Sequence, residues 1–184
     1  MPKFIAFLRA INVGNHTVKM DQLRQLFEDL GFANVETFIA SGNVIFDAKV
    51  KDIRSLESKI GKHLEKALGY EVTTFVRSTD ELAAICGYQP FSQEELTTDG
   101  NTLFIGFLAS KPTTVAAAKL RSLASAIDGL HLDDRELYWL YRRQNGESKL
   151  YGPLLEKTIG VKATLRNANT IKRLAAKYCQ QDLK

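Results

Sequence analysis

"KFIAFLRA", residues 3–10, decides the fold, because its apolar residues occupy both alternating positions of an extended chain. A strand of this kind is covered on both faces and lies in the middle of a sheet. A second stretch with the same property, "NTLFIGFLAS", begins at residue 101. We therefore expect two central strands and a chain built as two halves around them.

The elements that follow the first strand predict a complete α+β unit. Capping residues and apolar spacing mark their ends: Gly31 ends the first helix, Ser41 and Gly42 form a hairpin, and Ser78 with Glu81 has the form of a capping box. The order β-α-β-β-α-β plus a helix is that of the ferredoxin-like split βαβ arrangement. The predicted segments are a helix at 20–30, strands at 33–40 and 43–48, a helix at 53–67, a strand at 71–77 and a short helix from 78.

The second half repeats this order without clear residue identity, so the repeat is topological. Pro112 opens its first helix, and Asp133-Asp134 joins its hairpin. We predict an α+β fold of two tandem ferredoxin-like halves, each βαββαβ plus an extra helix. The predicted domains are residues 1–88 and 101–184, joined by a linker at 89–100 that contains a short helical turn.

Composition suggests an ordinary globular protein of the reducing cytoplasm. The 184 residues are 45% hydrophobic and 25% charged, which is close to the average for soluble proteins. Cys86 and Cys179 share no metal-ligand spacing and are interpreted as buried free thiols. Since the chain shows neither a signal peptide nor an apolar run of about 18–20 residues, we expect no membrane partner. No HxxxH or HExxH spacing occurs, and we expect no metal and no cofactor.

Charge is concentrated in the last third of the chain. The net charge is +4, whereas residues 135–184 alone carry +7. Such an excess attracts phosphate or nucleic acid, or it is the solvated surface of helices. The segment "RELYWLYRRQNG", 135–146, interleaves aromatic and basic residues as RNA-binding sheets do. It is apolar on both faces and lacks the consensus of that module, which favours packing in the core.

The loop "RAINVGNHTVKM", residues 9–20, is the first candidate site. Arg9 follows a covered face and needs acceptors, Asn12 tolerates a left-handed backbone, and Gly14 permits a positive φ. Together with Lys19 at the next helix N-terminus, these groups could form an anion cradle. The loop lacks the glycine spacing of a phosphate or dinucleotide loop. The alternative is that Arg9 and Asn12 only tie the loop to neighbouring backbone.

Two further stretches supply candidate residues. In "SGN", 41–43, Ser41 and Asn43 fit ordinary hairpin chemistry and could also approach the opening loop. In "LRNANT", 165–170, Asn167 or Asn169 can cap the last helix. Arg166 places positive charge where the helix dipole opposes it, so we expect a nearby anion, either Asp or Glu of this chain or an external ligand.

Three motifs carry a resemblance to a known family. "RAINVGNHTVKMDQL", "FIASGNVIF" and "ATLRNANTIKRLA" resemble, in order, the motifs of the bacterial family named domain of unknown function 1697. The chain departs from that pattern at Ala10, Asn15 and Phe38, where Gly, Gly and Tyr are usual, and these changes should stiffen the loop. The resemblance implies two small α+β domains and no assigned reaction.

The leading functional hypothesis is binding of an anionic ligand, phosphate-bearing or nucleotide-like, by the polar loops near Arg9, Asn12 and Arg166. One alternative is an enzyme acting on a small phosphorylated or carboxylated metabolite, in which His16 is the candidate general base. The other alternative is nucleic-acid binding by the basic last third.

Overall fold

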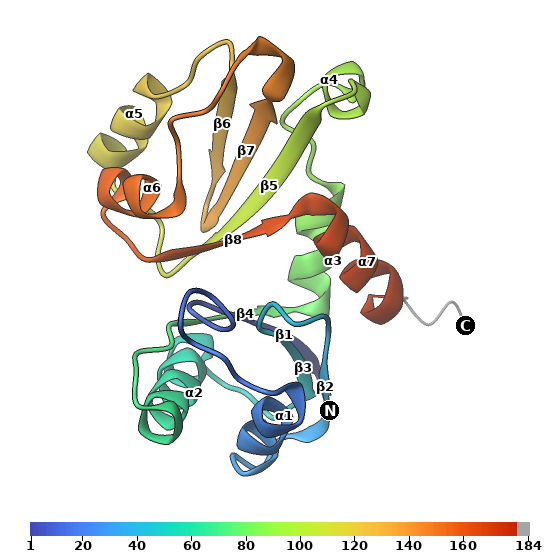
Figure 1. Ribbon diagram of the computed structural model, residues 1–184. Helices are drawn as coiled ribbons and strands as arrows, with labels where there is room; N and C mark the ends of the chain where they lie inside the picture. Colours follow the sequence, from blue (N-terminus) through green and yellow to red (C-terminus); the bar gives the residue numbers. More distant parts are fainter. Residues whose placement is uncertain (180–184) are drawn as a thin grey trace. The chain divides into compact units, whose positions relative to one another are not determined.

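The chain consists of two α+β units, each with one four-stranded antiparallel sheet (Figure 1). The structure is a computed structural model and describes residues 1–179. Its contacts divide the chain after Leu82. Both sheets have the strand order of a ferredoxin-like unit, in which the first strand lies between the third and the fourth. The predicted fold of two tandem ferredoxin-like halves is therefore confirmed.

The first unit follows the predicted order of elements. Its sheet has the order β2-β3-β1-β4, and every neighbouring pair is antiparallel. A further helix, α3, starts in this unit and ends in the next. The elements are β1 (Lys3–Leu8), α1 (Met20–Glu28), β2 (Ala33–Thr37), β3 (Asn43–Asp47), α2 (Ile53–Leu68), β4 (Thr74–Ser78) and α3 (Thr79–Gly87).

Local capping sets the ends of these helices. The Asp52 carboxylate accepts hydrogen bonds from the backbone N–H groups of Arg54 and Ser55 at the start of α2. Gly69, with φ +80°, ends α2 in the left-handed conformation. At α3, the Ser78 hydroxyl accepts from the Glu81 backbone N–H, and the Glu81 carboxylate accepts from that of Ser78. The predicted capping box is thus confirmed.

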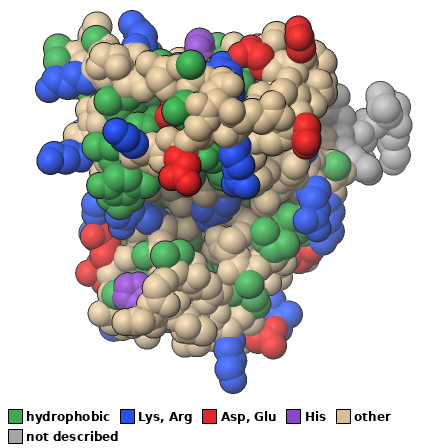
Figure 2. Space-filling model, turned by 45° about the horizontal axis from the view of Figure 1, so that its top comes forward, with side chains coloured by type: hydrophobic (Ala, Val, Ile, Leu, Met, Phe, Trp, Pro, Cys, Tyr) green, Lys and Arg blue, Asp and Glu red, His purple; other side chains and the backbone are tan. Residues whose placement is uncertain are grey.

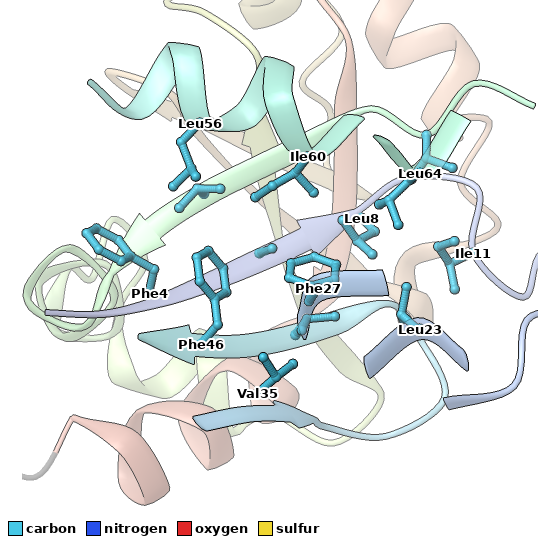
Figure 3. Close-up of a cluster of buried hydrophobic side chains, with 14 of the residues drawn as sticks. Phe4, Leu8, Ile11, Leu23, Phe27, Val35, Phe46, Leu56, Ile60 and Leu64 are labelled. Carbon is cyan, nitrogen blue, oxygen red and sulfur yellow. The ribbon is translucent and has the colours of Figure 1, made fainter. Parts of the chain in front are cut away.

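The core of the first unit lies between the sheet and the helices α1 and α2. Phe4 and Leu8 of β1 face Phe27 of α1 and Ile60 of α2 in this layer, as Figure 3 shows. Ile5, on the opposite face of β1, has no exposed surface either. The central strand is therefore covered on both faces, as its apolar pattern predicts.

The second unit repeats the arrangement with the order β6-β7-β5-β8. Helices α5 and α6 pack against one another, and α7 packs on β5 and β8. Within the described residues, every helix is too short or too polar to cross a bilayer. The elements are α4 (Gln93–Thr97), β5 (Asn101–Leu108), α5 (Thr114–Ser122), β6 (Asp128–Asp133), β7 (Glu136–Arg142), the 3-10 turn η1 (Arg143–Asn145), α6 (Gly152–Ile159), β8 (Ala163–Asn167) and α7 (Ala168–Tyr178).

The segment 89–100, predicted as a linker, packs on the second unit. The Glu95 carboxylate of α4 lies 2.6 Å from Arg142 of β7, and the Gln144 side chain donates to the Asp99 carbonyl at 2.7 Å. The boundary between the units lies inside α3 instead, because these polar contacts hold the segment to the second sheet. The predicted division into domains at 1–88 and 101–184 with a linker at 89–100 stays a prediction, and residues 180–184 lie outside the described residues.

The aromatic strand of the second unit belongs to its core. Tyr138 and Trp139 of β7 are buried, and the Trp139 indole N–H donates to the Asp128 carboxylate at 2.8 Å. Buried rings have no face free for bases to stack on. The sequence interpretation that favoured core packing over base stacking is confirmed for these two residues.

Candidate functional site

The opening loop adopts a left-handed backbone at three positions. Ala10, Asn12 and Gly14 have φ angles of +66°, +54° and +60°. Asn12 and Gly14 were predicted to tolerate this conformation, and both adopt it. The family that this sequence resembles usually has glycine at the position of Ala10. A residue with a Cβ atom is strained by about 1–2 kcal/mol in the left-handed conformation.

Asn12 ties the opening loop to the hairpin between β2 and β3. Its side-chain oxygen accepts from the Val18 backbone N–H at 2.8 Å, and its amide nitrogen donates to the Ala40 carbonyl at 3.0 Å. A backbone hydrogen bond from Leu8 to Gly42 lies alongside. The hairpin therefore meets the loop at Ala40, and Asn12 has the backbone-tying role that was one of its two alternatives. The approach of Ser41 and Asn43 to Arg9 and Asn12 stays a prediction.

The "SGN" hairpin is held by hydrogen bonds among its own and adjacent residues. Asn43 is fully buried, and its amide donates to the Phe38 carbonyl at 3.1 Å and to the Ser41 hydroxyl at 2.8 Å. Gly42 has φ +71°, and a Cβ atom at this position would lie 3.0 Å from Cβ of Ile11. Hairpin chemistry accounts for these contacts of Ser41 and Asn43, and a ligand-binding role for them stays a prediction.

The rest of the opening loop is held by backbone and ring contacts. Arg9 is half-buried, and its backbone N–H donates to the Thr73 carbonyl at 2.9 Å. The His16 ring stacks on the Tyr70 ring with centroids 3.7 Å apart. Lys19 is the exposed N-cap residue of α1, and its side chain makes no capping hydrogen bond. Ligand binding by Arg9, Gly14 and Lys19 stays a prediction.

A second group of predicted residues lies at the junction of β8 and α7. The Arg166 guanidinium donates to the Thr164 hydroxyl at 2.8 Å and to the Leu165 carbonyl at 2.9 Å. Burial lowers its pKa to about 10, because a low dielectric disfavours the charged form. Two acceptors of Arg166 are uncharged groups of its own strand, and its predicted pairing with a carboxylate or an external anion stays a prediction.

Asn167 caps the last helix, which confirms one of the two predicted capping residues. Its side-chain oxygen accepts from the Asn169 backbone N–H at 2.8 Å. The first turn of the 11-residue helix α7 contains no acidic residue. The helix N-terminus carries partial positive charge, and the nearest cationic residues in sequence are Arg166 before it and Lys172 after its first turn.

A polar pocket opens at this junction, and we call it the junction pocket. Its volume is about 120 Å³. Within the part of the chain that the structure describes, the Thr102 hydroxyl, the Asn169 side-chain amide and the Lys172 ammonium make no hydrogen bond. The residues that line the pocket are Leu96, Asn101, Thr102, Leu103, Asn167, Ala168, Asn169 and Lys172.

Sequence reasoning identified Asn167 in this pocket and missed Thr102 and Lys172. Thr102 belongs to a predicted strand, and nothing in the local sequence indicates that it lines a binding site. It comes close to Asn167 because β5 pairs with β8, with Phe104 opposite Asn167. Lys172 was recognised only as part of the polar face of the last helix. Its spacing of four residues from Ala168 is the signal that places it over the first turn.

The predicted site residues therefore form two groups, one in each unit. The first comprises Arg9, Asn12, Gly14, Lys19, Ser41 and Asn43, and the second comprises Arg166 and Asn167. No cluster of three His, Cys, Asp or Glu side chains suited to a metal ion occurs in residues 1–179. On the face shown in Figure 2, basic side chains are scattered among acidic and neutral ones.

Comparison with known proteins identifies the family and the fold. The model of the family described as "Protein of unknown function (DUF1697)" matches residues 1–138, so the chain belongs to this family. A conserved bacterial protein of Streptococcus pneumoniae, SP0830, has a similar structure, with a TM-score of 0.78 and 21% sequence identity over 98% of this chain and 99% of that chain. At this identity the likeness shows the fold. No curated protein matches the chain.

Proposed function

We propose that this member of the DUF1697 family binds a small anion, a phosphate or carboxylate group, in the junction pocket. The proposal rests on one observation: several side-chain hydrogen-bond donors with no acceptor in the described chain surround one cavity at a helix N-terminus. The side chains of Thr102, Asn169 and Lys172 line it and make no hydrogen bond in the described chain. An anion would accept from several of them at once.

The position of Lys172 supports this proposal. It lies four residues after Ala168, the first residue of α7, so both fall on one face of the helix. Side chains on a helix lean toward its N-terminus, which directs the Lys172 ammonium over the first turn. There it meets the positive end of the helix dipole, and a bound anion relieves that conflict.

The composition of the pocket favours binding over acid–base catalysis. Among the described residues that line it, Lys172 alone carries a titratable side chain. General acid–base chemistry is performed by titratable groups within hydrogen-bond reach of the reacting atoms. The pocket offers one cation and several neutral donors, which suits recognition of an anionic group.

Thermal unfolding in the presence of inorganic phosphate or pyrophosphate tests the proposal. An anion at about ten times its Kd should stabilise the folded protein by about 1.4 kcal/mol, which raises Tm by about 3–6 °C for a chain of this size. Sodium chloride at equal ionic strength is the reference, because screening acts on every exposed charge. Lys172→Gln should abolish most of the increase.

Two further variants locate the anion. Lys177→Gln removes a charge from the opposite end of α7 and should keep the increase in Tm. Arg9→Ala tests the opening loop, the other predicted anion site. An increase that survives Lys172→Gln but disappears in Arg9→Ala would reject the junction pocket. The absence of any increase with phosphate and pyrophosphate would reject anion binding by either site.

A further inference from the structure

An apolar slot lies beside the junction pocket within the second unit. The two share four lining residues: Leu96, Leu103, Ala168 and Lys172. Beyond these, the slot is walled by the apolar side chains of Ile85 and Ile105 and by the Tyr138 ring. A single molecule can therefore place a charged group among the donors of the junction pocket and a hydrophobic group in the slot.

The outer wall of the slot is formed by Tyr88, which is 39% exposed. Its hydroxyl lies 2.7 Å from Nε2 of His131, and its ring packs on Tyr138 with centroids 5.2 Å apart. The accessible volume of the slot is about 20 Å³, enough for about one water molecule. An exposed aromatic wall can rotate outward about χ1, and a ligand ring would then take its place against Tyr138.

The slot also contains a buried donor that is weakly engaged. Tyr138 is 1% exposed, and its hydroxyl donates to the Ile85 carbonyl at 3.4 Å, the long limit of a hydrogen bond. Burial raises the pKa of Tyr138, with smaller contributions from Glu136 and Asp133, so the hydroxyl stays protonated. It can therefore orient a ligand that fills the slot.

We infer that the anion recognised by this protein is part of an organic phosphate or carboxylate with an aromatic group, whose ring enters the apolar slot while its anionic group occupies the junction pocket. The inference rests on the proposed anion binding and narrows it to a ligand class. Ligand sites commonly combine apolar walls with a few convergent polar groups.

Comparison of phenyl phosphate with inorganic phosphate by titration calorimetry tests this inference. Burial of the ring should make phenyl phosphate bind about tenfold or more tightly than phosphate. Ile85→Phe fills the slot at a residue that does not line the junction pocket, and it should remove that advantage while phosphate binding is kept. Leu132→Phe, which adds the same volume at a half-buried position packed in the α5–α6 core cluster, should keep it.

The rate at which Cys86 is alkylated gives a second measurement, because Cys86 lines the slot and the slot carries no substitution. In a Cys179→Ser background, phenyl phosphate should slow alkylation of Cys86 several-fold, whereas phosphate should not. Binding of phosphate with no advantage for phenyl phosphate would overturn the inference and leave anion binding standing. A full advantage retained in Ile85→Phe, with Cys86 unprotected, would also overturn it. Failure of both ligands to bind would reject the proposed function itself.

Discussion

The contact between the hairpin and the opening loop makes Gly42 and Gly14 a matched pair for a stability measurement. Both glycines have positive φ angles, +71° and +60°, so alanine introduces the same kind of backbone strain at each. A Cβ atom at Gly14 would meet no atom within 4 Å. At Gly42 it would lie 3.0 Å from Cβ of Ile11 and 3.2 Å from Cβ of Leu8, both of which are buried.

The two substitutions should therefore differ by the cost of close packing. Left-handed strain of about 1–2 kcal/mol, less about 0.4–1 kcal/mol gained from a stiffer unfolded chain, leaves a loss of about 1 kcal/mol for Gly14→Ala. Overpacking adds about 1–3 kcal/mol, so Gly42→Ala should lose about 3 kcal/mol. The added Cβ also presses on the Leu8 carbonyl, 3.3 Å away, beside the Leu8–Gly42 hydrogen bond.

Urea denaturation followed by far-ultraviolet circular dichroism measures the difference. With an m-value of about 2 kcal/mol/M, a difference of about 2 kcal/mol separates the two midpoints by about 1 M. Trp139 fluorescence reports on the second unit and serves as an internal reference for both variants. Equal midpoints for Gly42→Ala and Gly14→Ala would refute the reasoning, because only the close approach distinguishes the two sites.

Three other substitutions test single features of the structure. Ile39 is a β-branched residue with φ +52° and 43% exposure, so Ile39→Asn should raise the free energy of unfolding by about 1 kcal/mol in urea denaturation. Asn12→Ala should lower it by about 1–3 kcal/mol, because the buried Val18 N–H loses its acceptor. The hydrogen bond from Arg142 lowers the pKa of Glu95 below its ordinary value of 4.5. The contribution of this hydrogen bond to the free energy of unfolding is present above that pH and is lost as pH falls. Glu95→Gln should therefore flatten the decrease in stability between about pH 5 and pH 3.

Each of these substitutions has a control in the same chain. Val115→Asn replaces an exposed apolar residue within a helix and should bring no gain like that of Ile39→Asn. Asn15→Ala removes an exposed asparagine of the same loop and should change stability by less than about 0.5 kcal/mol. Glu94→Gln, next to Glu95, should leave the pH dependence unchanged. A control that matches its test variant would show that the named contact is not the cause.

Most of the fold could be predicted because its signals are local. Apolar residues at both alternating positions define β1 and β5, and Gly69, which ends α2, acts through its own backbone conformation. The glycine predicted to end α1, Gly31, lies beyond its end, because α1 stops at Glu28 with Asp29 as the C-cap. The order of strands and helices then limits the topology, since strands joined by a hairpin must be antiparallel neighbours. The predicted linker was assigned from composition, and composition does not register the contact between Glu95 and Arg142, 47 residues apart.

The candidate site could be predicted only in part. Asn167 was identified because capping is a local property of the helix start. Arg166 donates to a hydroxyl and a carbonyl of its own strand, and its predicted pairing with a carboxylate or an external anion stays a prediction. Thr102 and Lys172 join Asn167 only through the pairing of β5 with β8 and the packing of α7.

The sequence by itself determined the class of fold, the order of the elements, the ends of several helices and the left-handed backbone at Asn12 and Gly14. These depend on periodicity, capping and backbone freedom, which are interactions between residues close in the chain. Only the tertiary structure decided that Asn12 binds the hairpin, that the rings of Tyr138 and Trp139 are buried, and that donors from β5 and α7 surround one cavity. Each of these depends on residues far apart in sequence, whose proximity is set by strand pairing and packing.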